Sequence, residues 1–216
     1  MAVGVETTTE WVVAGGVNWR FTTLKDRSQF HDPGGLHADM GVHENVWPIF
    51  GQLWPTARIL ADALGNYRFS GERVLELGCG LALISMVLHQ RGIDVLASDI
   101  HPLAKDFLQK NCANNGLSRI PFRRIDWTQS YPDLARFPVI VASDVLYENG
   151  MAPDIARFID EHGAQDCRVF VSDPGRSGRR NKFTRAMEEH GFDCEEWQDV
   201  ANVKGRIMTY VRGESA

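Results

Sequence analysis

Two glycines and a carboxylate near the middle of the chain have the spacing of a nucleotide-binding site. Gly78-Cys79-Gly80 follows the short apolar run at 74–77 and precedes a helical pattern. A glycine-rich turn between a strand and a helix lets a nucleotide approach the backbone closely. Asp99 ends the next apolar run, 21 residues after Gly78, where a carboxylate can accept hydrogen bonds from both ribose hydroxyls. The pair fits either a dinucleotide or an adenosyl ligand.

Two further positions favour the adenosyl ligand. The dinucleotide fingerprint places a third glycine at position 83, where this chain has Leu83. S-Adenosylmethionine has no pyrophosphate, so it has less need of a glycine-crowded helix N-terminus. Its amino acid end carries an ammonium, for which Glu76 is a suitable nearby anion. A nicotinamide-dependent oxidoreductase remains the alternative that Leu83 disfavours.

Asp126-Trp127 follows the expected third strand, where an adenine would lie. The carboxylate could accept a hydrogen bond from the adenine N6, and the indole could stack on the ring. A tryptophan taken alone is more often part of a core. For metals we predict no site, because no cysteines are spaced as CxxC and nothing completes a ligand set around His31, His37 and His43.

The elements that must position these residues are read from periodicity. Helical patterns at 55–64, 83–88, 103–112, 155–159 and 183–190 are each followed by a glycine that can adopt the left-handed C′ conformation, namely Gly65, Gly92, Gly116, Gly163 and Gly191. Between them lie apolar runs without polar alternation, as in parallel strands buried on both faces, at 74–77, 95–97, 139–142 and 169–171. Helices that alternate with buried strands predict an α/β fold with right-handed crossovers.

The remaining segments complete the predicted architecture. Residues 195–197 and 207–211 predict two final strands at an antiparallel edge, and 9–24 predict a hairpin around Gly15-Gly16. Residues 25–46 lack periodicity and predict a lid loop. We therefore expect a Rossmann-like, seven-stranded, mostly parallel sheet with helices on both faces and an N-terminal β-hairpin. The hairpin and loop extension would span residues 1–46, and the Rossmann-like domain residues 47–216.

Composition and charge limit the classes of protein and of binding partner that the sequence allows. With 216 residues and 44% apolar residues the chain can bury a full core. A net charge of −5 argues against binding nucleic acid through bulk charge. The N-terminus does not read as a signal peptide, and no apolar stretch approaches the roughly 18 residues of a membrane helix. We expect a cytoplasmic monomer with reduced thiols and no membrane or nucleic-acid partner.

In their order along the chain, these motifs resemble those of class I S-adenosylmethionine-dependent methyltransferases, and more narrowly the methyltransferase-like protein lysine methyltransferases (methyltransferase family 16). The resemblance rests on residues 76–80 (ELGCG), Asp99, residues 126–127 (DW) and residues 143–147 (SDVLY), with Trp54-Pro55 and the hairpin before them. It implies that Trp54, the Gly78–Gly80 turn, Asp99, Trp127 and Ser143 touch the cofactor. With Glu76 and Asp126 from the reasoning above and Ile100 beside Asp99, the predicted cofactor contacts are Trp54, Glu76, Gly78, Cys79, Gly80, Asp99, Ile100, Asp126, Trp127 and Ser143. Many relatives have a third glycine where this chain has Ala82, and an alanine there is tolerable if the turn needs no positive φ.

The acceptor end is predicted at Asp144 and Tyr147. Strand ends in an open α/β sheet face the ligand crevice. Val145-Leu146 replace the two prolines common in enzymes that methylate base amines, which favours the Asp-x-x-Tyr pattern of lysine-modifying relatives. Asp144 could hold an ammonium and Tyr147 could offer a π face. The competing interpretation makes Asp144 a turn or cap residue and Tyr147 a core aromatic.

The sequence therefore predicts an enzyme that transfers the methyl group of S-adenosylmethionine to a lysine of a protein substrate and leaves S-adenosylhomocysteine. A small-molecule N- or O-methyltransferase and a noncatalytic adenosyl-ligand-binding protein remain the alternatives. The sequence does not name the acceptor or the degree of methylation.

Overall fold

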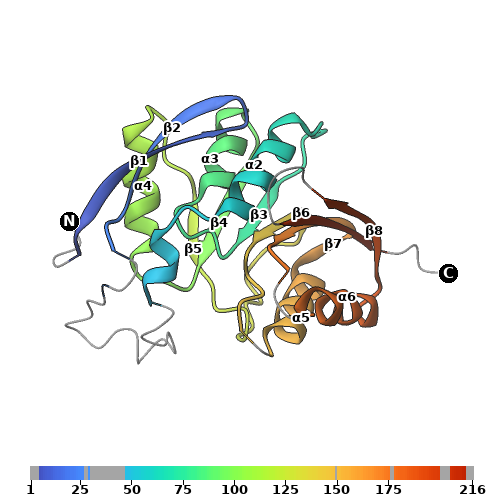
Figure 1. Ribbon diagram of the computed structural model, residues 1–216. Helices are drawn as coiled ribbons and strands as arrows, with labels where there is room; N and C mark the ends of the chain where they lie inside the picture. The colour runs from blue at the N-terminus through green and yellow to red at the C-terminus, as the bar shows by residue number, and fades with distance from the viewer. Residues whose placement is uncertain are drawn as a thin grey trace.

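The sheet has seven strands in the order β5-β4-β3-β6-β7-β9-β8 (Figure 1). The computed structural model describes residues 5–26, 29, 47–148, 150–175, 178–199 and 205–212. The strands are β3 (Val74–Leu77), β4 (Val95–Asp99), β5 (Phe122–Arg124), β6 (Phe137–Ser143), β7 (Gly163–Asp173), β8 (Phe192–Asp199) and β9 (Arg206–Arg212). Neighbours from β5 to β7 pair in parallel, whereas β9 runs antiparallel to both β7 and β8. The predicted seven-stranded, mostly parallel sheet with an antiparallel edge is confirmed.

Helices cover both faces of the sheet. They are η1 (Trp47–Gly51), α2 (Pro55–Asn66), α3 (Leu83–Gln90), α4 (Ala104–Asn114), α5 (Met151–His162) and α6 (Arg179–Glu189). Figure 1 shows α2, α3 and α4 on one side and α5 and α6 on the other. Successive strand residues point to opposite faces, so in β3 Val74 joins the cluster under α2–α4 while Leu75 joins the cluster under α5 and α6. Both faces are therefore apolar, which explains the runs without alternation.

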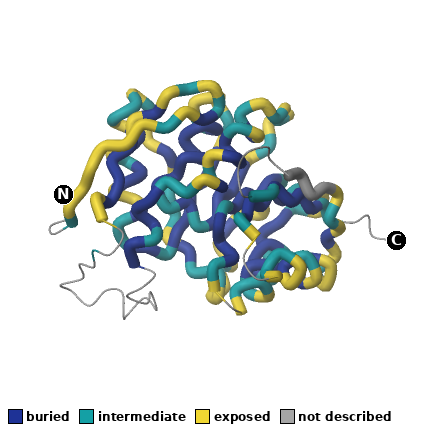
Figure 2. The backbone as a smooth tube through the Cα atoms, in the orientation of Figure 1, coloured by how far each residue is buried: buried dark blue, intermediate teal, exposed yellow. Residues whose placement is uncertain are grey.

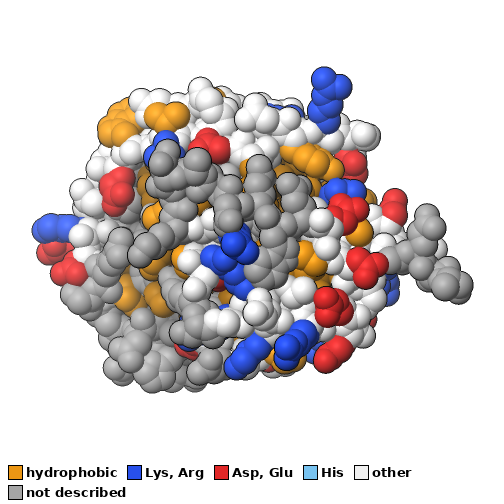
Figure 3. Space-filling view, turned by 45° about the vertical axis from the view of Figure 1, so that its right-hand side comes forward, with side chains coloured by type: hydrophobic (Ala, Val, Ile, Leu, Met, Phe, Trp, Pro, Cys, Tyr) orange, Lys and Arg blue, Asp and Glu red, His pale blue; other side chains and the backbone are white. Residues whose placement is uncertain are grey.

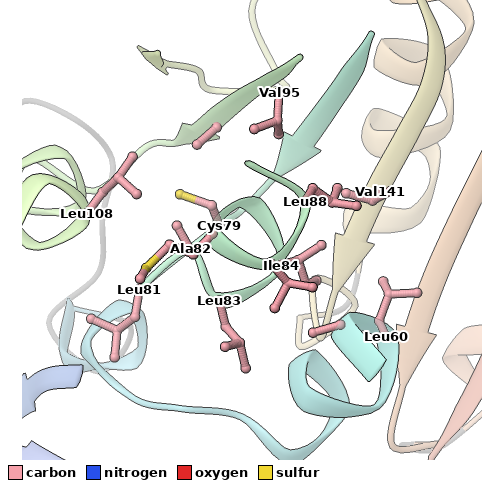
Figure 4. Packing of buried hydrophobic residues seen from close by; sticks show 14 of the residues in the cluster. Leu60, Cys79, Leu81, Ala82, Leu83, Ile84, Leu88, Val95, Leu108 and Val141 are labelled. Atoms are coloured by element: carbon pink, nitrogen blue, oxygen red, sulfur yellow. The ribbon is translucent and has the colours of Figure 1, made fainter. Parts of the chain in front are cut away.

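Helix α3 is packed on all sides, which fixes the turn at its start. Figure 4 shows Leu83, Ile84 and Leu88 of α3 among side chains from neighbouring elements, with Leu60 on α2 and Val141 on β6. All five are buried. Displacing the first turn of α3 would open cavities in this cluster, so the loop that joins β3 to α3 has little freedom to move.

Three of the five predicted glycine helix ends are confirmed and two are wrong. Gly92, Gly116 and Gly191 have φ of 79°, 67° and 76°. Gly65 lies inside α2, and a Cβ there would come within 2.7 Å of the Cα of Gly15 in the hairpin. Gly163 has an extended backbone, with φ −77°, and begins β7. At both positions a tertiary contact or an immediately following strand overrides the local signal.

The hairpin forms an additional layer over the helices. Strands β1 (Thr7–Ala14) and β2 (Val17–Leu24) pair in antiparallel register around Gly15-Gly16, which have φ of 58° and 77°. Trp19 and Phe21 are buried in the same cluster as α2–α4. The predicted lid at 25–46 falls almost wholly outside the described residues, as do the three loop histidines and the boundary predicted after residue 46.

The surface carries mixed charge. On the face in Figure 3, acidic and basic side chains alternate with hydrophobic ones, and no single sign covers the coloured part. Of the helices described, none is both long and apolar enough to cross a membrane.

Candidate active site

One cavity collects nearly all the predicted site residues at the carboxyl ends of the central strands. Its lining includes Trp54, Glu76, Gly78, Cys79, Gly80, Asp99, Ile100, Trp127, Ser143, Asp144 and Tyr147. These residues come from β3, β4 and β6, from the loops that follow β3, β4, β5 and β6, and from the residue that precedes α2. Asp126 is the one predicted site residue outside this lining. The cavity therefore joins the two ends of the site that the sequence predicts.

The turn after β3 is held in a left-handed backbone at alternate residues. Gly78 and Gly80 have φ of 61° and 52°. A Cβ on Gly78 would lie 2.9 Å from Cγ1 of Val145, and one on Gly80 would lie 2.9 Å from the carbonyl oxygen of Phe50. Both conformation and space therefore require glycine, and the turn exposes backbone rather than side chains to the cavity.

Ala82 departs from what the sequence led us to expect. We expected alanine to be tolerable if the turn needs no positive φ, but Ala82 has φ 62° and ψ 39°. This is the left-handed region, where a Cβ crowds the following carbonyl at a cost of roughly 1–2 kcal/mol. Ala82 is buried and directly precedes α3, so packing around that helix must offset the strain.

Asp99 is fixed at the end of β4 by backbone donors. Gly80 donates its N–H to Oδ2 and His101 donates its N–H to Oδ1, each at 2.8 Å. The side chain is only 8% exposed, and burial raises the pKa of this carboxyl. Each carboxylate oxygen has two lone pairs, so both can accept a further hydrogen bond from a ligand in the cavity.

Glu76 is a buried acid on the face of β3 that α3 covers. It is 2% exposed, and its Oε2 accepts a bond of 2.9 Å from the backbone N–H of Ser85 and a second bond from the Ser85 hydroxyl. Burial raises the pKa of Glu76 to about 8, with a smaller contribution from the neighbouring charge of Asp99. The free protein therefore keeps this carboxyl largely protonated at neutral pH, and a cation beside it would favour ionisation.

Of the two residues predicted to contact the adenine, only Trp127 lines the cavity. Trp127 lines the cavity, with indole Cζ3 3.5 Å from the position of a Cβ on Gly78. Asp126 instead uses Oδ1 to accept bonds from the backbone N–H and the hydroxyl of Thr128, at 2.9 and 2.7 Å. Asp126 therefore lies outside the cavity lining with one carboxylate oxygen held in a local turn, and its contact with the adenine stays a prediction.

Trp54 and Ser143 lie where the first helix meets the sheet. Trp54 is the N-cap residue of α2, and its indole Nε1 donates to the carbonyl of Ile49 at 3.1 Å. The Ser143 hydroxyl at the end of β6 lies 3.3 Å from Oγ1 of Thr56. Both side chains are partly exposed to the cavity.

Asp144 has an uncommon backbone conformation for a residue with a side chain. Its φ is 55°, and its N–H donates to the carbonyl of Ser172 on β7 at 2.8 Å. It is 9% exposed. It is not a helix cap, since α5 begins at Met151 with Gly150 as its N-cap. Aspartate tolerates this region better than most residues, and such outliers concentrate at functional sites.

Tyr147 lies on the same wall of the cavity. Burial raises the pKa of its phenol, and the nearby charges of Asp99, Glu148 and Asp144 raise it further. The hydroxyl therefore stays protonated at physiological pH. It can donate or accept a hydrogen bond and can present its ring face to a cation, but it cannot serve as an anionic base.

Sequence reasoning missed two aromatic residues of this cavity. Phe50 and His101 line it and stack on each other with centroids 3.6 Å apart and planes at 14°. His101 is 3% exposed, and its Nδ1 accepts the N–H of Leu103 at 3.1 Å. The position of His101 two residues after Asp99 was the available signal, whereas Phe50 lies in a short helix without periodicity. Among the described residues no cluster of His, Cys, Asp or Glu is arranged to hold a metal ion.

Comparison with known proteins agrees with this geometry. The lysine methyltransferase family profile matches residues 40–190. The electron transfer flavoprotein beta subunit lysine methyltransferase of Danio rerio is 30% identical over 138 residues, which cover 61% of this chain and 50% of that protein. The histone-arginine methyltransferase METTL23 of Xenopus laevis is 32% identical over 123 residues, which cover 52% of this chain and 53% of that protein. The chain thus spans about half the length of these curated relatives.

A solved structure supports the fold over the whole chain. The 16S rRNA N2 G1207 methyltransferase of T. thermophilus, in complex with AdoMet and guanosine, aligns with a TM-score of 0.68 at 18% identity, covering 99% of this chain and 52% of that one. The profile match begins after the β1–β2 hairpin, so the resemblance that we extended to the hairpin is not part of that match. With the profile covering well over half of its residues, the chain belongs to the lysine methyltransferase family.

Proposed function

We propose that this protein binds S-adenosylmethionine in the cavity and transfers its methyl group to a lysine side chain of a protein. The observation that carries the proposal is that Asp99 and the glycine turn share one cavity with Asp144 and Tyr147. A cofactor held by the first pair would place its reactive end within reach of an acceptor held by the second pair, and such positioning is a main lever on a displacement reaction.

The residues of the cavity fit an adenosyl amino acid. Asp99 has free lone pairs on both oxygens for ribose hydroxyls, and the glycine turn, in which a Cβ would collide with Val145 or Phe50, presents backbone to the cavity. Glu76 can ionise to pair with an ammonium, and Trp127 offers a ring face. Leu83 opens α3, so the helix start beside the cavity is not crowded with glycines as a pyrophosphate site would require.

The acceptor wall suits an amine. When bound, S-adenosylmethionine supplies an electrophilic methyl group. A lysine with a pKa near 10.4 is neutral in only about one molecule in 2,500 at pH 7, so the site must bind the ammonium and assist loss of its proton. Asp144 holds the ammonium and orients its nitrogen, and burial in the cavity lowers the amine pKa. Tyr147 contacts the amine through its neutral hydroxyl or ring face.

The alternatives differ in what they require of this wall. A noncatalytic adenosyl-binding protein has no need of Asp144 in the cavity at a left-handed φ. A small-molecule methyltransferase remains the alternative for the acceptor, and no contact of the described residues favours it. A relative named for histone arginine widens the basic protein side chains to be tested.

The test is label transfer. The protein is incubated with S-adenosylmethionine labelled in the methyl group and a cell lysate, and the products are separated by gel and analysed by mass spectrometry. We expect labelled protein bands with methyl-lysine, and none with Asp144→Asn. Label only in small metabolites would overturn the protein acceptor, and methyl-arginine would overturn lysine. In a separate melting assay S-adenosylhomocysteine should raise the melting temperature and NAD should not.

A further inference from the structure

The two edges of the β1–β2 hairpin differ in how their backbone groups are paired. On the β2 edge, Asn111 of α4 and its C-cap residue Asn115 bind the outward groups: the Thr22 N–H donates to Asn111 Oδ1 at 2.7 Å and the Arg20 N–H donates to Asn115 Oδ1 at 2.8 Å. Asn115 Nδ2 also donates to the carbonyl of Arg20 at 2.8 Å. The β2 edge is therefore covered by side chains of the domain, as edges usually are.

The β1 edge carries no such cover. Ala14 pairs with Val17 across a two-residue turn, which makes this a hydrogen-bonded pair and turns the N–H and C=O of Val13, Trp11 and Thr9 outward. Within the part of the chain that the structure describes, these outward groups have no hydrogen-bond partner. Figure 2 shows β1 as an exposed strand at the outside of the molecule. An open edge of this kind is a template for another strand.

Exposed apolar side chains mark the same strand. Trp11 is 64% exposed and Val13 is 51% exposed, and among the described residues these two are the exposed large hydrophobic side chains. Tryptophan is enriched at binding interfaces because it combines a large apolar area with one polar group. Nothing in the packing of the hairpin uses this ring, since the neighbouring Val12 and the buried Trp19 face the helices instead.

A groove runs between β1 and α2 and reaches the candidate active site. One wall is formed by Glu10, Trp11 and Val12, and the other by residues of α2 from Pro55 to Asp62. Leu53, Trp54 and Leu83 line both this groove and the cavity. The eight residues from Pro55 to Asp62 rise over roughly 10 Å, which matches about three residues of extended chain.

Charge in the groove favours a basic occupant. Of the described residues that line the groove, Glu10 and Asp62 are acidic and Arg58 is basic, which leaves one net negative charge among them. Arg58 Nε lies 3.9 Å from Asp62 Oδ2, a distance too long for a tight pair, while Asp62 Oδ1 accepts the N–H of Gly15 at 2.8 Å. A lysine-bearing segment would complement this balance.

We propose that an extended, lysine-bearing segment of the methyl-accepting protein pairs with the β1 edge and lies in this groove, so that a lysine beyond the paired residues enters the cavity beside Trp54. Backbone bonds to Thr9, Trp11 and Val13 supply affinity with little demand on sequence, and Trp11 covers the segment. This inference rests on the proposed function, because it names how that acceptor docks.

The test removes edge donors without breaking the hairpin ladder. The Trp11 N–H points outward, so Trp11→Pro deletes a docking donor and spares the bonds between β1 and β2. Asn18→Pro is the matched control: Asn18 is exposed and pairs with Val13, but its outward N–H lies on the opposite edge. We expect Trp11→Pro to lower the rate of label transfer into lysate protein at least tenfold, and Asn18→Pro to stay within twofold of wild type.

Two readouts separate docking from folding and from the proposed function. Affinity for S-adenosylhomocysteine should stay within twofold of wild type in both variants. Benzoylphenylalanine placed at position 11 should crosslink to the protein band that becomes methylated, whereas at position 18 it should not. Crosslinking tests the docking site even if Trp11→Pro lowers the melting temperature.

Equal transfer by Trp11→Pro and wild type, or crosslinking that is absent or equal at the two positions, overturns the docking groove and leaves the proposed function standing. Wild-type protein that labels no protein at all overturns the proposed function, and the groove with it.

Discussion

The two walls of the cavity hold their carboxylates in different ways. On the cofactor wall, Asp99 accepts backbone N–H bonds from Gly80 and His101, all within one strand–turn unit and its neighbour. On the acceptor wall, Asp144 has a left-handed φ of 55° and its own N–H is held by Ser172 of β7. The first carboxylate is fixed by local turns, and the second depends on the register between β6 and β7.

In the proposed function the first wall binds the cofactor and the second meets the acceptor, so the difference would separate a binding surface from a reactive one. On the cofactor wall both donors to Asp99 are backbone N–H groups of the turns that follow β3 and β4, so the position of this carboxylate depends on local structure. A non-glycine residue in a sparsely populated conformation persists only where the surrounding structure over-determines it. At Asp144 that surrounding structure comes from β7 and from the buried Val145 and Leu146 that follow it. If the two walls act independently, substitutions on one should lower ligand affinity and substitutions on the other should lower the rate of methyl transfer.

The largest effect is expected at Asp144. Asparagine tolerates a left-handed backbone about as well as aspartate, so Asp144→Asn removes the charge with little added strain. If the carboxylate holds the acceptor ammonium, kcat should fall by about 10²–10⁴-fold, the usual range for a positioned acid–base group. Label-transfer kinetics with the lysate acceptor measure this loss, and S-adenosylhomocysteine affinity by calorimetry should stay near wild type.

The control for this variant is Glu148→Gln. Glu148 is exposed a short distance beyond Asp144, and its loss should change kcat by less than about twofold, as expected for a surface charge. A folded Asp144→Asn protein that transfers label at the wild-type rate would show that the acceptor wall has no catalytic carboxylate.

Asp99 and Asp126 give the next comparison, between a carboxylate that lines the cavity and one that does not. Asp99→Asn should weaken S-adenosylhomocysteine binding by roughly 1.5–3 kcal/mol, about 10- to 150-fold, because it removes hydrogen bonds to a charged acceptor. Asp126→Asn should have almost no effect, since the Asp126 carboxylate bonds to Thr128 and not to the cavity. Isothermal titration of both variants measures the contrast, and equal losses would return Asp126 to the cofactor site.

Glu76 gives a pH dependence whose sign is fixed by its environment. Its pKa is about 8 in the folded protein against an ordinary value of 4.5. The folded state therefore keeps a proton that the unfolded chain loses, so the stability from this group is fully present below pH 4.5 and is lost as the pH rises toward 8. The slope is up to about 1.4 kcal/mol per pH unit. Urea unfolding from pH 5 to 8 should show this slope in wild type and a flatter curve in Glu76→Gln.

The same group links cofactor binding to proton release. A ligand ammonium beside Glu76 favours its ionised form, so S-adenosylhomocysteine should bind more tightly as the pH rises to about 8. Calorimetry at pH 7 in two buffers of different ionisation heat should give different binding enthalpies. Identical enthalpies would mean that Glu76 stays protonated and does not pair with the ammonium.

Much of the fold and of the cofactor wall could be predicted from the sequence because their signals are local. Buried strands that alternate with helices specify the sheet, and Gly78, Gly80 and Asp99 occupy fixed places relative to strand ends. The sequence analysis did not foresee the local turn that engages the Asp126 carboxylate, although an aspartate two residues before a threonine N–H readily forms such a turn.

The features that sequence reasoning missed depend on contacts between distant segments. Gly65 reads as a helix end, yet it stays helical because the hairpin turn packs against it. Phe50 and His101 meet from segments on either side of β3 and α3. The hairpin edges show the same limit: nothing in the alternation of β1 and β2 reveals that α4 covers one edge and leaves the other open.

The smallest effect is expected at Ala82. A substitution there tests whether the backbone of the cofactor wall stores strain. Unlike Gly78 and Gly80, it adopts its positive φ with a Cβ. Ala82→Gly removes that strain, partly offset by the greater freedom of glycine in the unfolded chain, so unfolding should become harder by roughly 0.5–1 kcal/mol. Ala63→Gly is the matched control, because Ala63 is exposed within α2 and the same substitution there should destabilise by about 1 kcal/mol. Urea unfolding of both variants should therefore shift in opposite directions. If both destabilise the protein alike, the turn at Ala82 stores no strain, and the contrast between a relaxed cofactor wall and a strained acceptor wall becomes stronger.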